Sequence, residues 1–260
     1  MKIAISGKGG VGKTLLASLL SKTFAESGYS VLAIDADPDA NLAANLGFPD
    51  PDKITPISEL SDVIEERVGA KPGTSGSYFR LNPKVDDLVD KYASRQGNIR
   101  LLVMGRIKRG GTGCYCPEGA LVQALLSHLL LQREDVVILD MEAGIEHLTR
   151  GTARGVDRLI VVVEPGRRSI ETAQRIFELA QDLNIKAIGV VGNKIHTQEQ
   201  NDFIRNSLPS VEFLGFIPYD EAIIDADLAN RSVTESSLPA ITEVKKIYQT
   251  LISDAKKKKQ

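Results

Sequence analysis

Eight residues decide the fold of this 260-residue chain: Gly7-Lys8-Gly9-Gly10-Val11-Gly12-Lys13-Thr14. They fit the pattern G-x-x-x-x-G-K-[ST] and lie between an apolar segment, Lys2–Ser6, and an amphipathic segment, Thr14–Glu26, which predict a strand and a helix. Glycines let backbone N–H groups turn inward around a phosphate at the N-terminus of a helix. The pattern therefore predicts a phosphate-binding loop, in which Lys13 reaches the β and γ phosphates and the Thr14 hydroxyl ligates Mg²⁺.

Short apolar runs alternate with longer amphipathic segments along the chain, which is the pattern of βαβ units. Several runs are continuously apolar, so these strands are expected to be buried on both faces. The expected strands are Lys2–Ser6, Ser30–Ile34, Arg100–Met104, Asp135–Leu139, Arg158–Val163, Lys186–Val191 and Val211–Phe216. The expected helices are Thr14–Glu26, Gly119–Leu131, Ile170–Leu183 and Thr242–Ile252. We predict an α/β fold with a doubly wound, mainly parallel sheet, the fold of a P-loop NTPase, with helices on both faces.

The composition excludes several other classes of protein. With 42% hydrophobic and 25% charged residues and a net charge of -2, the chain is not disordered, collagen-like or a coiled coil, and nothing indicates a nucleic-acid partner. No apolar run reaches the roughly 18 residues of a membrane span. We expect a cytoplasmic protein without stable membrane association, and we find no signal peptide.

One domain is expected over residues 1–260. Residues 48–98 are interrupted by prolines and glycines and contain helical pieces at Asp62–Glu66 and Pro83–Tyr92, which predicts a surface insertion suited to docking a partner. The chain ends in a lysine-rich tail, residues 256–260, which is expected to be solvated.

Acidic residues follow two further expected strands. Asp35, Asp37 and Asp39 end the second strand, and Asp140 closes the apolar run Val137-Ile138-Leu139, as in a Walker B strand. Because the carboxyl ends of parallel strands meet at one edge of a sheet, these carboxylates are expected near the phosphate loop. Asp140 is expected to hold Mg²⁺ through water, and the following residues, 142–146, to form a loop that a γ-phosphate orders. Capping of the following helix is the simpler role for Asp35 and Asp39.

A second lysine, Lys8, opens the phosphate loop. The resulting sequence, Lys-Gly-Gly-Val-Gly-Lys-Thr, resembles the deviant Walker A motif of the MinD, ParA, ArsA and nitrogenase iron protein class of dimerising ATPases. The resemblance implies that Lys8 stabilises the transferred phosphoryl group of a partner subunit, whereas chemistry alone also allows a surface lysine that attracts substrate. It also implies that Asp37 is the switch I aspartate, which orients or deprotonates the attacking water near Mg²⁺. The other expected nucleotide contacts in the loop are Gly9, Gly10, Val11, Gly12 and Leu15, which stands where many such loops carry a second hydroxyl.

A later segment indicates which base is bound. Gly192-Asn193-Lys194-Ile195-His196 resembles the Asn-Lys-x-Asp motif of GTPases, but His196 replaces the aspartate that reads guanine. Without this acceptor for the N1 and N2 hydrogens of guanine, an Asn193 amide that pairs with adenine is the better match, so ATP is favoured over GTP and Lys194 is expected beside the base. Pro218 resembles the adenine-flanking segment of the same ATPase class, although a plain turn explains it almost as well.

The chain has two cysteines, Cys114 and Cys116, which follow the Arg100–Met104 strand. Two thiolates one residue apart can both bind a soft metal, but they fill only two positions of a four-coordinate site. A symmetric dimer would supply all four. A redox pair, which usually has the spacing Cys-x-x-Cys, and two ordinary small residues remain alternatives.

Taken together, the deviant loop, Asp-Ala-Asp-Pro, Gly-Cys-x-Cys-Pro-Glu and Met-Glu-Ala-Gly-Ile-Glu-His resemble the CooC-type maturation factors of carbon monoxide dehydrogenase over nearly the whole chain. The related factor for acetyl-CoA synthase, AcsF, carries the same set. The resemblance implies a homodimeric ATPase with ATP/ADP and Mg²⁺ as cofactors. It implies that Cys114 and Cys116 of both subunits bind Ni²⁺, or Zn²⁺, since thiolates accept both ions. The implied client is apo carbon monoxide dehydrogenase or apo acetyl-CoA synthase.

Two other classes of function remain open from the sequence. A MinD- or ParA-like spatial organiser would bind membrane or DNA, and membrane targeting would require the C-terminal helix to expose its apolar face. An electron-transfer protein like nitrogenase iron protein would bridge the dimer with one iron–sulfur cluster.

Overall fold

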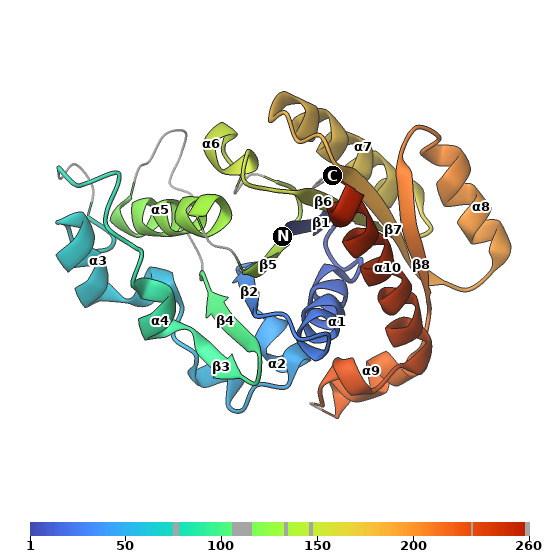
Figure 1. Ribbon diagram of the computed structural model, residues 1–260, viewed down its shortest axis with the longest axis horizontal. Helices are drawn as coiled ribbons and strands as arrows, with labels where there is room; N and C mark the ends of the chain where they lie inside the picture. The colour runs from blue at the N-terminus through green and yellow to red at the C-terminus, as the bar shows by residue number, and fades with distance from the viewer. Residues whose placement is uncertain (75–77, 106–115, 133–134, 146–147, 230, 258–260) are drawn as a thin grey trace.

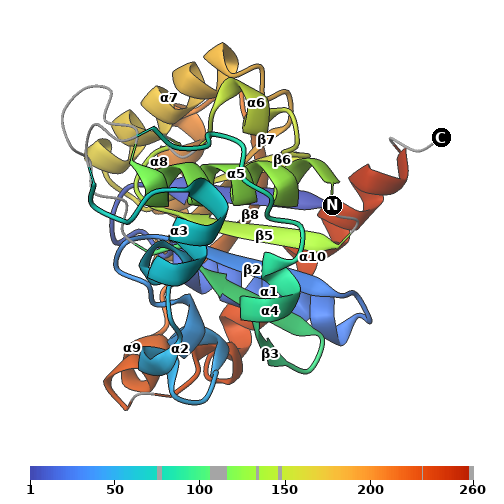
Figure 2. The same cartoon turned by 90° about the vertical axis from the view of Figure 1, so that its left-hand side faces the viewer.

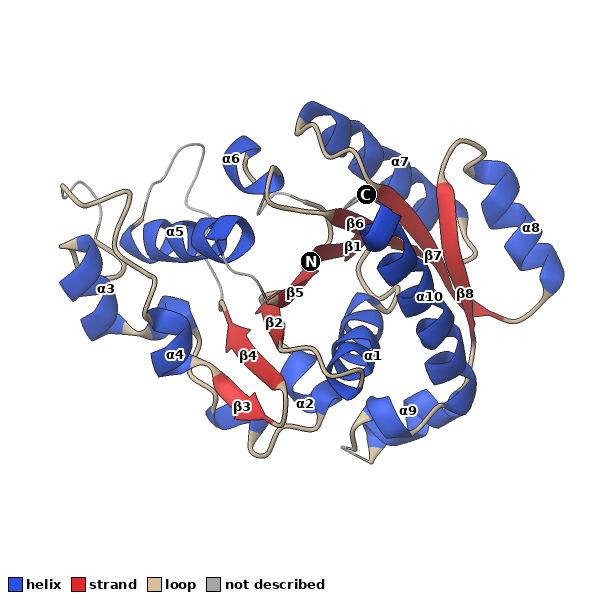
Figure 3. Cartoon of the chain, viewed as in Figure 1, coloured by secondary structure: helices blue, strands red, loops and turns tan. Residues whose placement is uncertain are grey.

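The computed structural model describes residues 1–74, 78–105, 116–132, 135–145, 148–229 and 231–257. Within these ranges an eight-stranded sheet has the order β3-β4-β2-β5-β1-β6-β7-β8 (Figure 3). Its strands are β1 (Lys2–Gly7), β2 (Val31–Ala36), β3 (Ser94–Gln96), β4 (Ile99–Val103), β5 (Val136–Met141), β6 (Arg158–Val163), β7 (Ile188–Ile195) and β8 (Glu212–Pro218). The β3 strand pairs antiparallel with β4, and the other strands pair in parallel.

Helices cover both faces of this sheet, as the alternation of apolar runs predicted (Figure 1). One layer contains α1 (Lys13–Glu26), α2 (Leu42–Leu46), α9 (Glu221–Leu228) and α10 (Leu238–Lys257). The other contains α3 (Ser61–Val68), α4 (Leu88–Tyr92), α5 (Pro117–Gln132), α6 (Arg150–Ala153), α7 (Arg167–Asp182) and α8 (Gln198–Ser207). Successive strand residues point to opposite faces, so Ile3 and Ile5 pack in the first layer and Ala4 in the second. The predicted doubly wound α/β fold is confirmed.

The seven predicted strands are all present; Arg158–Val163 has the predicted bounds and the others differ by up to four residues, but β3 was not predicted. It has three residues, Ser94-Arg95-Gln96, which carry no apolar pattern because the strand forms the exposed edge of the sheet. The predicted helix ranges also left out α2, α6, α8 and α9. Among the described residues of α8 only the side chain of Ile204 is buried, so the sequence has too few apolar positions there to show a helical pattern.

Residues 48–98 contain α3, α4, β3 and the 3₁₀ turns η1 (Pro51–Lys53) and η2 (Ile57–Glu59). The prediction of a helical piece over Pro83–Tyr92 was wrong in its first half, because the helix begins only at Leu88. Before it, a turn joins the Leu88 N–H to the Val85 carbonyl at 3.1 Å, and the Arg67 guanidinium donates to the Lys84 carbonyl. These contacts favour a turn over helix.

The C-terminal helix α10 packs on β8 and α1, and its apolar residues Val244, Ile247 and Leu251 are buried. Its apolar face is therefore covered, which is the opposite of what membrane targeting would require. Lys256 and Lys257 are exposed, as expected of a solvated tail, but they form the last turn of α10, where the helix dipole favours positive charge. Residues 258–260 lie outside the described residues. Of the helices described, none is long and apolar enough to cross a membrane.

Candidate functional site

The predicted phosphate loop joins the central strand β1 to α1. Gly10 and Gly12 have φ of 77° and 97°, in the left-handed region that favours glycine, and Gly12 is the N-cap of α1. A Cβ at Gly12 would overlap the side-chain amide of Asn193. The loop therefore needs glycine at this position for two separate reasons, backbone conformation and space.

A cavity of about 720 Å³ opens over this loop at the carboxyl edge of the sheet. Three groups of residues line it. The loop supplies Gly9, Gly10, Gly12, Lys13, Thr14 and Leu15; the ends of β2 and β5 and their following segments supply Asp37, Asp39, Asn41, Asn45, Glu142 and Ala143; the region of α9 supplies Ile223, Ile224, Asp227 and Val233. The cavity thus brings together the loop, Asp37 and Glu142, which are distant in sequence.

A second cavity, of about 810 Å³, lies in the same region, where α2 and α9 lie side by side (Figure 2). Its lining includes Ala44, Phe48, Asp50, Ala222 and Arg231. The phosphate loop contributes to the smaller cavity, so we assign the nucleotide to that one.

Lys13 is buried, and its Nζ donates to the Lys8 carbonyl at 3.4 Å, so its charge lies inside the curve of the loop. Lys8 points elsewhere: its Nζ donates to Glu164 Oε1 at 3.1 Å. Lys8 is not among the described residues that line the cavity over the loop. The structure therefore brings Lys13 and Thr14 to the cavity and holds the Lys8 side chain outside it.

Asp140 lies at the end of β5, directly opposite Asp35 of β2 in the parallel ladder. Both side chains are fully buried. Within the described part of the chain, neither carboxylate oxygen of Asp140 has a hydrogen-bond partner. Burial, reinforced by the charge of Asp35, raises the pKa of Asp140 to about 8; the nearby Thr14 hydroxyl, which forms no regular hydrogen bond with the carboxylate, and the Lys13 charge act in the opposite direction.

The two orphaned oxygens of Asp140 fit a site for a cation. A bound Mg²⁺ would supply the missing partner charge, and Thr14 and Asp37 on the neighbouring cavity wall are oxygen ligands of the kind that Mg²⁺ prefers. In the described ranges no three His, Cys, Asp or Glu side chains form a ready-made metal cluster. An ion held by one or two protein oxygens, with waters and phosphate oxygens completing its shell, suits this arrangement.

Asp35 has a different environment from Asp140. Its Oδ2 accepts the Leu42 N–H at 2.9 Å and its Oδ1 accepts the Asp37 N–H at 3.2 Å. Leu42 is the first residue of α2, whose N-cap is Asn41 and has no side-chain cap, so Asp35 is not the cap residue but satisfies one N–H of the first turn from the end of β2. Burial raises the pKa of Asp35 to about 6, and the two backbone N–H groups oppose the shift. Asp35 thus closes the loop that carries Asp37, and Asp37 Oδ1 in turn accepts the Asp39 N–H at 3.0 Å.

Asn193 and Lys194, predicted beside the base, lie at the end of β7 and contact the phosphate loop. Asn193 Nδ2 donates to the Val11 carbonyl at 2.7 Å, and Lys194 Nζ donates to the Gly10 carbonyl at 2.6 Å. The sequence analysis missed this bracing of the loop. Contact with adenine stays a prediction, as does that of Pro218, which pairs with Ile195 in the ladder of β7 and β8.

Of the predicted metal ligands, Cys114 lies outside the described residues, as does Glu146 of the predicted γ-phosphate loop. Cys116 is partly exposed and immediately precedes α5. Burial raises the pKa of its thiol, and the nearby Glu118 adds to the shift. A metal ion would therefore have to displace the proton. Glu118 Oε2 also accepts the Gly73 N–H at 3.3 Å, which ties residues 48–98 to the start of α5 beside Cys116.

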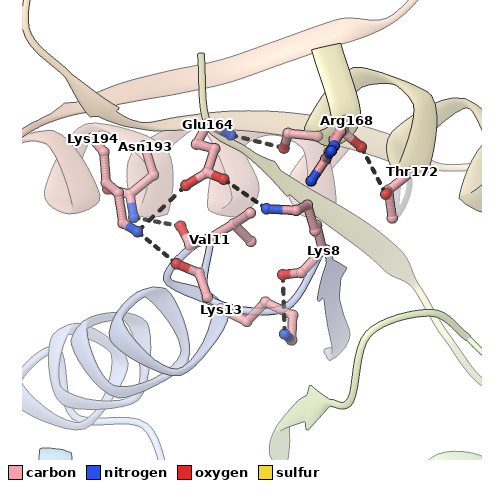
Figure 4. A network of polar contacts seen from close by, with 10 residues as sticks. Lys8, Val11, Lys13, Glu164, Arg168, Thr172, Asn193 and Lys194 are labelled. Carbon is pink, nitrogen blue, oxygen red and sulfur yellow. Dashed lines mark hydrogen bonds and ion pairs between the residues drawn. The ribbon is translucent and has the colours of Figure 1, made fainter. Parts of the chain in front are cut away.

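Glu164 was missed by the sequence analysis, although it follows the predicted strand Arg158–Val163 and so had the same signal as Asp140, a carboxylate at the ligand edge of the sheet. It accepts hydrogen bonds from two lysines of the site, Lys8 and Lys194 (Figure 4).

Comparison with known proteins agrees with this geometry. Residues 2–233 match the model of the CobQ/CobB/MinD/ParA nucleotide binding domain. The chain is 49% identical to an uncharacterised ATP-binding protein of Methanocaldococcus jannaschii, over 97% of this chain and 98% of that protein. It is 46% identical to the carbon monoxide dehydrogenase accessory protein CooC of Rhodospirillum rubrum, over 91% of this chain and 90% of that protein.

The fold resembles solved structures of MinD at lower sequence identity. The MinC:MinD complex of Aquifex aeolicus matches with a TM-score of 0.70 and 22% identity, over 97% of this chain and 95% of that chain. MinD of Pyrococcus horikoshii, solved with Mg-ADP, matches with a TM-score of 0.69 and 21% identity, over 98% and 96%. The match to the family model, together with the phosphate loop and its cavity, identifies this chain as a P-loop ATPase that belongs to the CobQ/CobB/MinD/ParA nucleotide-binding family.

Proposed function

We propose that this ATPase is a nickel-handling maturation factor of the carbon monoxide dehydrogenase type. The observation that carries the proposal is the 46% identity to the accessory protein CooC, which spans 91% of the chain. The cysteine pair supports it, because two thiolates one residue apart can both bind a soft metal ion. Cys116 immediately precedes α5, and Cys114 is two residues before Cys116 in the sequence. In this proposal the cargo is Ni²⁺ and the client is apo carbon monoxide dehydrogenase or apo acetyl-CoA synthase.

The proposed ATP site uses the residues around the cavity of about 720 Å³. Lys13 binds the β and γ phosphates, and the N–H groups of Gly9, Gly10 and Gly12 surround them. Bound Mg²⁺ would neutralise charge on the phosphate oxygens, and Thr14 and Asp140 would hold it. Asp37, on a loop that Asp35 closes through two backbone N–H groups, orients the attacking water.

The proposed metal site forms between two copies of the chain. One chain supplies two thiols, Cys114 and Cys116, and four thiolates complete a four-coordinate site for Ni²⁺, or for Zn²⁺. ATP favours the closed homodimer and hydrolysis loosens it, which couples cargo binding to the nucleotide cycle. The raised pKa of the Cys116 thiol means that metal binding releases protons, so nickel affinity should increase with pH.

Equilibrium dialysis of ⁶³Ni²⁺ tests the proposal directly. The wild-type chain with Mg²⁺ and a non-hydrolysable ATP analogue should bind about one nickel per dimer. A Cys114→Ser, Cys116→Ser double variant should bind none and should keep its nucleotide affinity. The matched control is Lys13→Ala, which leaves both thiols in place and removes the phosphate contact, so nickel binding should no longer respond to the nucleotide. Unchanged nickel stoichiometry in the double variant would contradict the proposal.

Activation of purified apo-clients distinguishes the two enzymes. Nickel-loaded chain with ATP is added to apo carbon monoxide dehydrogenase and, in parallel, to apo acetyl-CoA synthase, and the recovered activity is compared with that from free Ni²⁺ at the same concentration. Faster recovery of one client identifies it. If neither client recovers faster than with free Ni²⁺, the maturation role is wrong.

A further inference from the structure

One carboxylate, that of Glu164, lies between two lysines at the rim of the phosphate loop. Its Oε1 accepts from Lys8 Nζ at 3.1 Å, and its Oε2 accepts from Lys194 Nζ at 3.4 Å. Figure 4 shows the two lysines reaching the carboxylate from opposite sides. The negative charge of Glu164 therefore lies between the positive charges of Lys8 and Lys194, at the rim of the loop that is proposed to bind a triphosphate.

The backbone of Glu164 is held on rigid structure. Glu164 directly follows the buried strand β6, and its backbone N–H contacts the hydroxyl of Ser169 in the first turn of α7 at 3.1 Å. Ser169 is itself buried. The backbone of Glu164 is therefore fixed, and its carboxylate is held by the two lysines.

The two lysines are held differently. Lys194 has a left-handed backbone, with φ of 58°, and its Nζ also donates to the Gly10 carbonyl at 2.6 Å. Lys194 thus has a second anchor, on the loop itself. Lys8 belongs to the loop, and its ammonium points to Glu164, away from the cavity that Lys13 and Thr14 line. Lys8 can leave Glu164 without disturbing the contact between Lys194 and Gly10.

We propose that Glu164 is a positioning residue that holds Lys8 outside the nucleotide cavity and competes with the triphosphate for this lysine. When ATP binds, the ammonium of Lys8 moves from the Glu164 carboxylate to phosphate oxygens, and Glu164 keeps its contact with Lys194. The γ-phosphate adds charge that ADP lacks, so the exchange favours ATP over ADP. The inference rests on the ATP-binding part of the proposed function and is independent of nickel.

The expected effect is modest, because the Lys8 and Glu164 side chains are 37% and 25% exposed. Ion pairs of this kind shift an equilibrium by roughly two- to five-fold. Glu164→Gln keeps the shape of the side chain and removes its charge. This variant should bind an ATP analogue with Mg²⁺ about two- to five-fold more tightly than the wild type, and its ADP affinity should change less.

Isothermal titration calorimetry on four proteins tests the competition: wild type, Glu164→Gln, Lys8→Ala and the double variant. The tighter ATP binding caused by Glu164→Gln should disappear in the Lys8→Ala background, because that background has no Lys8 ammonium to move from position 164 to the phosphates. If Glu164 merely supports the loop, Glu164→Gln weakens ATP and ADP binding equally, with or without Lys8, and the proposal is overturned. Should Glu164→Gln fold poorly, Glu164→Asp, which keeps the charge but withdraws it by one methylene, should show a smaller gain that also depends on Lys8; a gain that persists without Lys8 overturns the proposal.

The source of the phosphate is distinguished by repeating the titrations at low and high protein concentration. A gain that grows with protein concentration indicates the nucleotide of a second copy, and a constant gain indicates the chain's own nucleotide; both support the competition for Lys8. Absence of ATP binding in the wild type would refute the ATP site itself, whereas normal wild-type binding with an effect independent of Lys8 would refute only the role of Glu164.

Discussion

Replacing Asp140 with asparagine should stabilise the nucleotide-free chain while it removes ATPase activity. Asp140 is fully buried, and within the described residues its carboxylate oxygens have no hydrogen-bond partner. Burial raises its pKa from 3.8 to about 8. The folded chain therefore binds more protons at Asp140 than the unfolded chain between about pH 4 and pH 8, and its free energy of unfolding falls as the pH rises through this window.

The size of the effect follows from the same shift. One pH unit corresponds to about 1.4 kcal/mol, so the roughly 3 units between the ordinary pKa of Asp140 and pH 7 set an upper limit of about 4 kcal/mol. An asparagine amide at this position still lacks hydrogen-bond partners, which costs about 1–3 kcal/mol. Asp140→Asn should therefore raise the free energy of unfolding by about 1–3 kcal/mol at pH 7, and the gain should shrink toward pH 4.

Urea unfolding from pH 4 to pH 8, with EDTA and without nucleotide, measures this effect. Asp35→Asn is the matched control at the opposite ladder position. Asp35 accepts two backbone N–H groups on two different oxygens, and asparagine has only one acceptor oxygen, so this variant should lose about 1–3 kcal/mol. A less stable Asp140→Asn, or an unchanged pH slope, would show that the carboxylate is compensated in the folded state and that the cation-site argument is wrong.

Three further predictions follow from contacts around the loop and in residues 48–98. Gly12→Ala combines a positive φ of 97° with overlap of the Asn193 amide, so it should lower the free energy of unfolding by roughly 2–4 kcal/mol and abolish nucleotide binding, measured by thermal unfolding and calorimetry. Asn193→Ala removes the 2.7 Å bond to the Val11 carbonyl and should weaken ATP and GTP binding alike, by about 5- to 20-fold; loss of ATP binding alone would indicate that base contact is the main role. Arg67→Ala breaks two bonds to the Asp87 carboxylate, at 2.8 and 3.1 Å, and should increase hydrogen exchange in α3 and α4, whereas an unchanged exchange rate would mean that apolar packing alone holds them.

The strands, the phosphate loop and the acidic strand ends could be predicted because each leaves a local signal. A buried parallel strand is a continuous apolar run, and Arg158–Val163 was predicted with the bounds that β6 has. The tight loop requires glycine at Gly12, which the pattern contains. The rule that ligands lie at the carboxyl ends of parallel strands then predicted that Asp37 and Asp140 lie near the loop.

Short polar elements could not be predicted, because they do not depend on a hydrophobic pattern. The edge strand β3 is formed by pairing with β4, and the short helix α4 follows Asp87, whose carboxylate contacts Arg67 about twenty residues away in the chain. The contact between Asn193 and the phosphate loop could not be predicted for another reason. The sequence around Asn193 resembles a base-binding motif, and the spacing of residues does not show whether its side-chain amide donates to a base or to the Val11 carbonyl.

By itself, the sequence determined the doubly wound sheet, the phosphate loop and the two cysteines that a single chain can offer, because backbone conformation and apolar periodicity are local properties. The tertiary structure alone decided which charges meet. Asp140 faces Asp35 because β2 and β5 are neighbours in register, and Glu164 holds Lys8 because β6 ends beside the loop. Electrostatic interactions depend on distance and burial rather than on sequence separation, so the environments of these groups exist only once the sheet has formed.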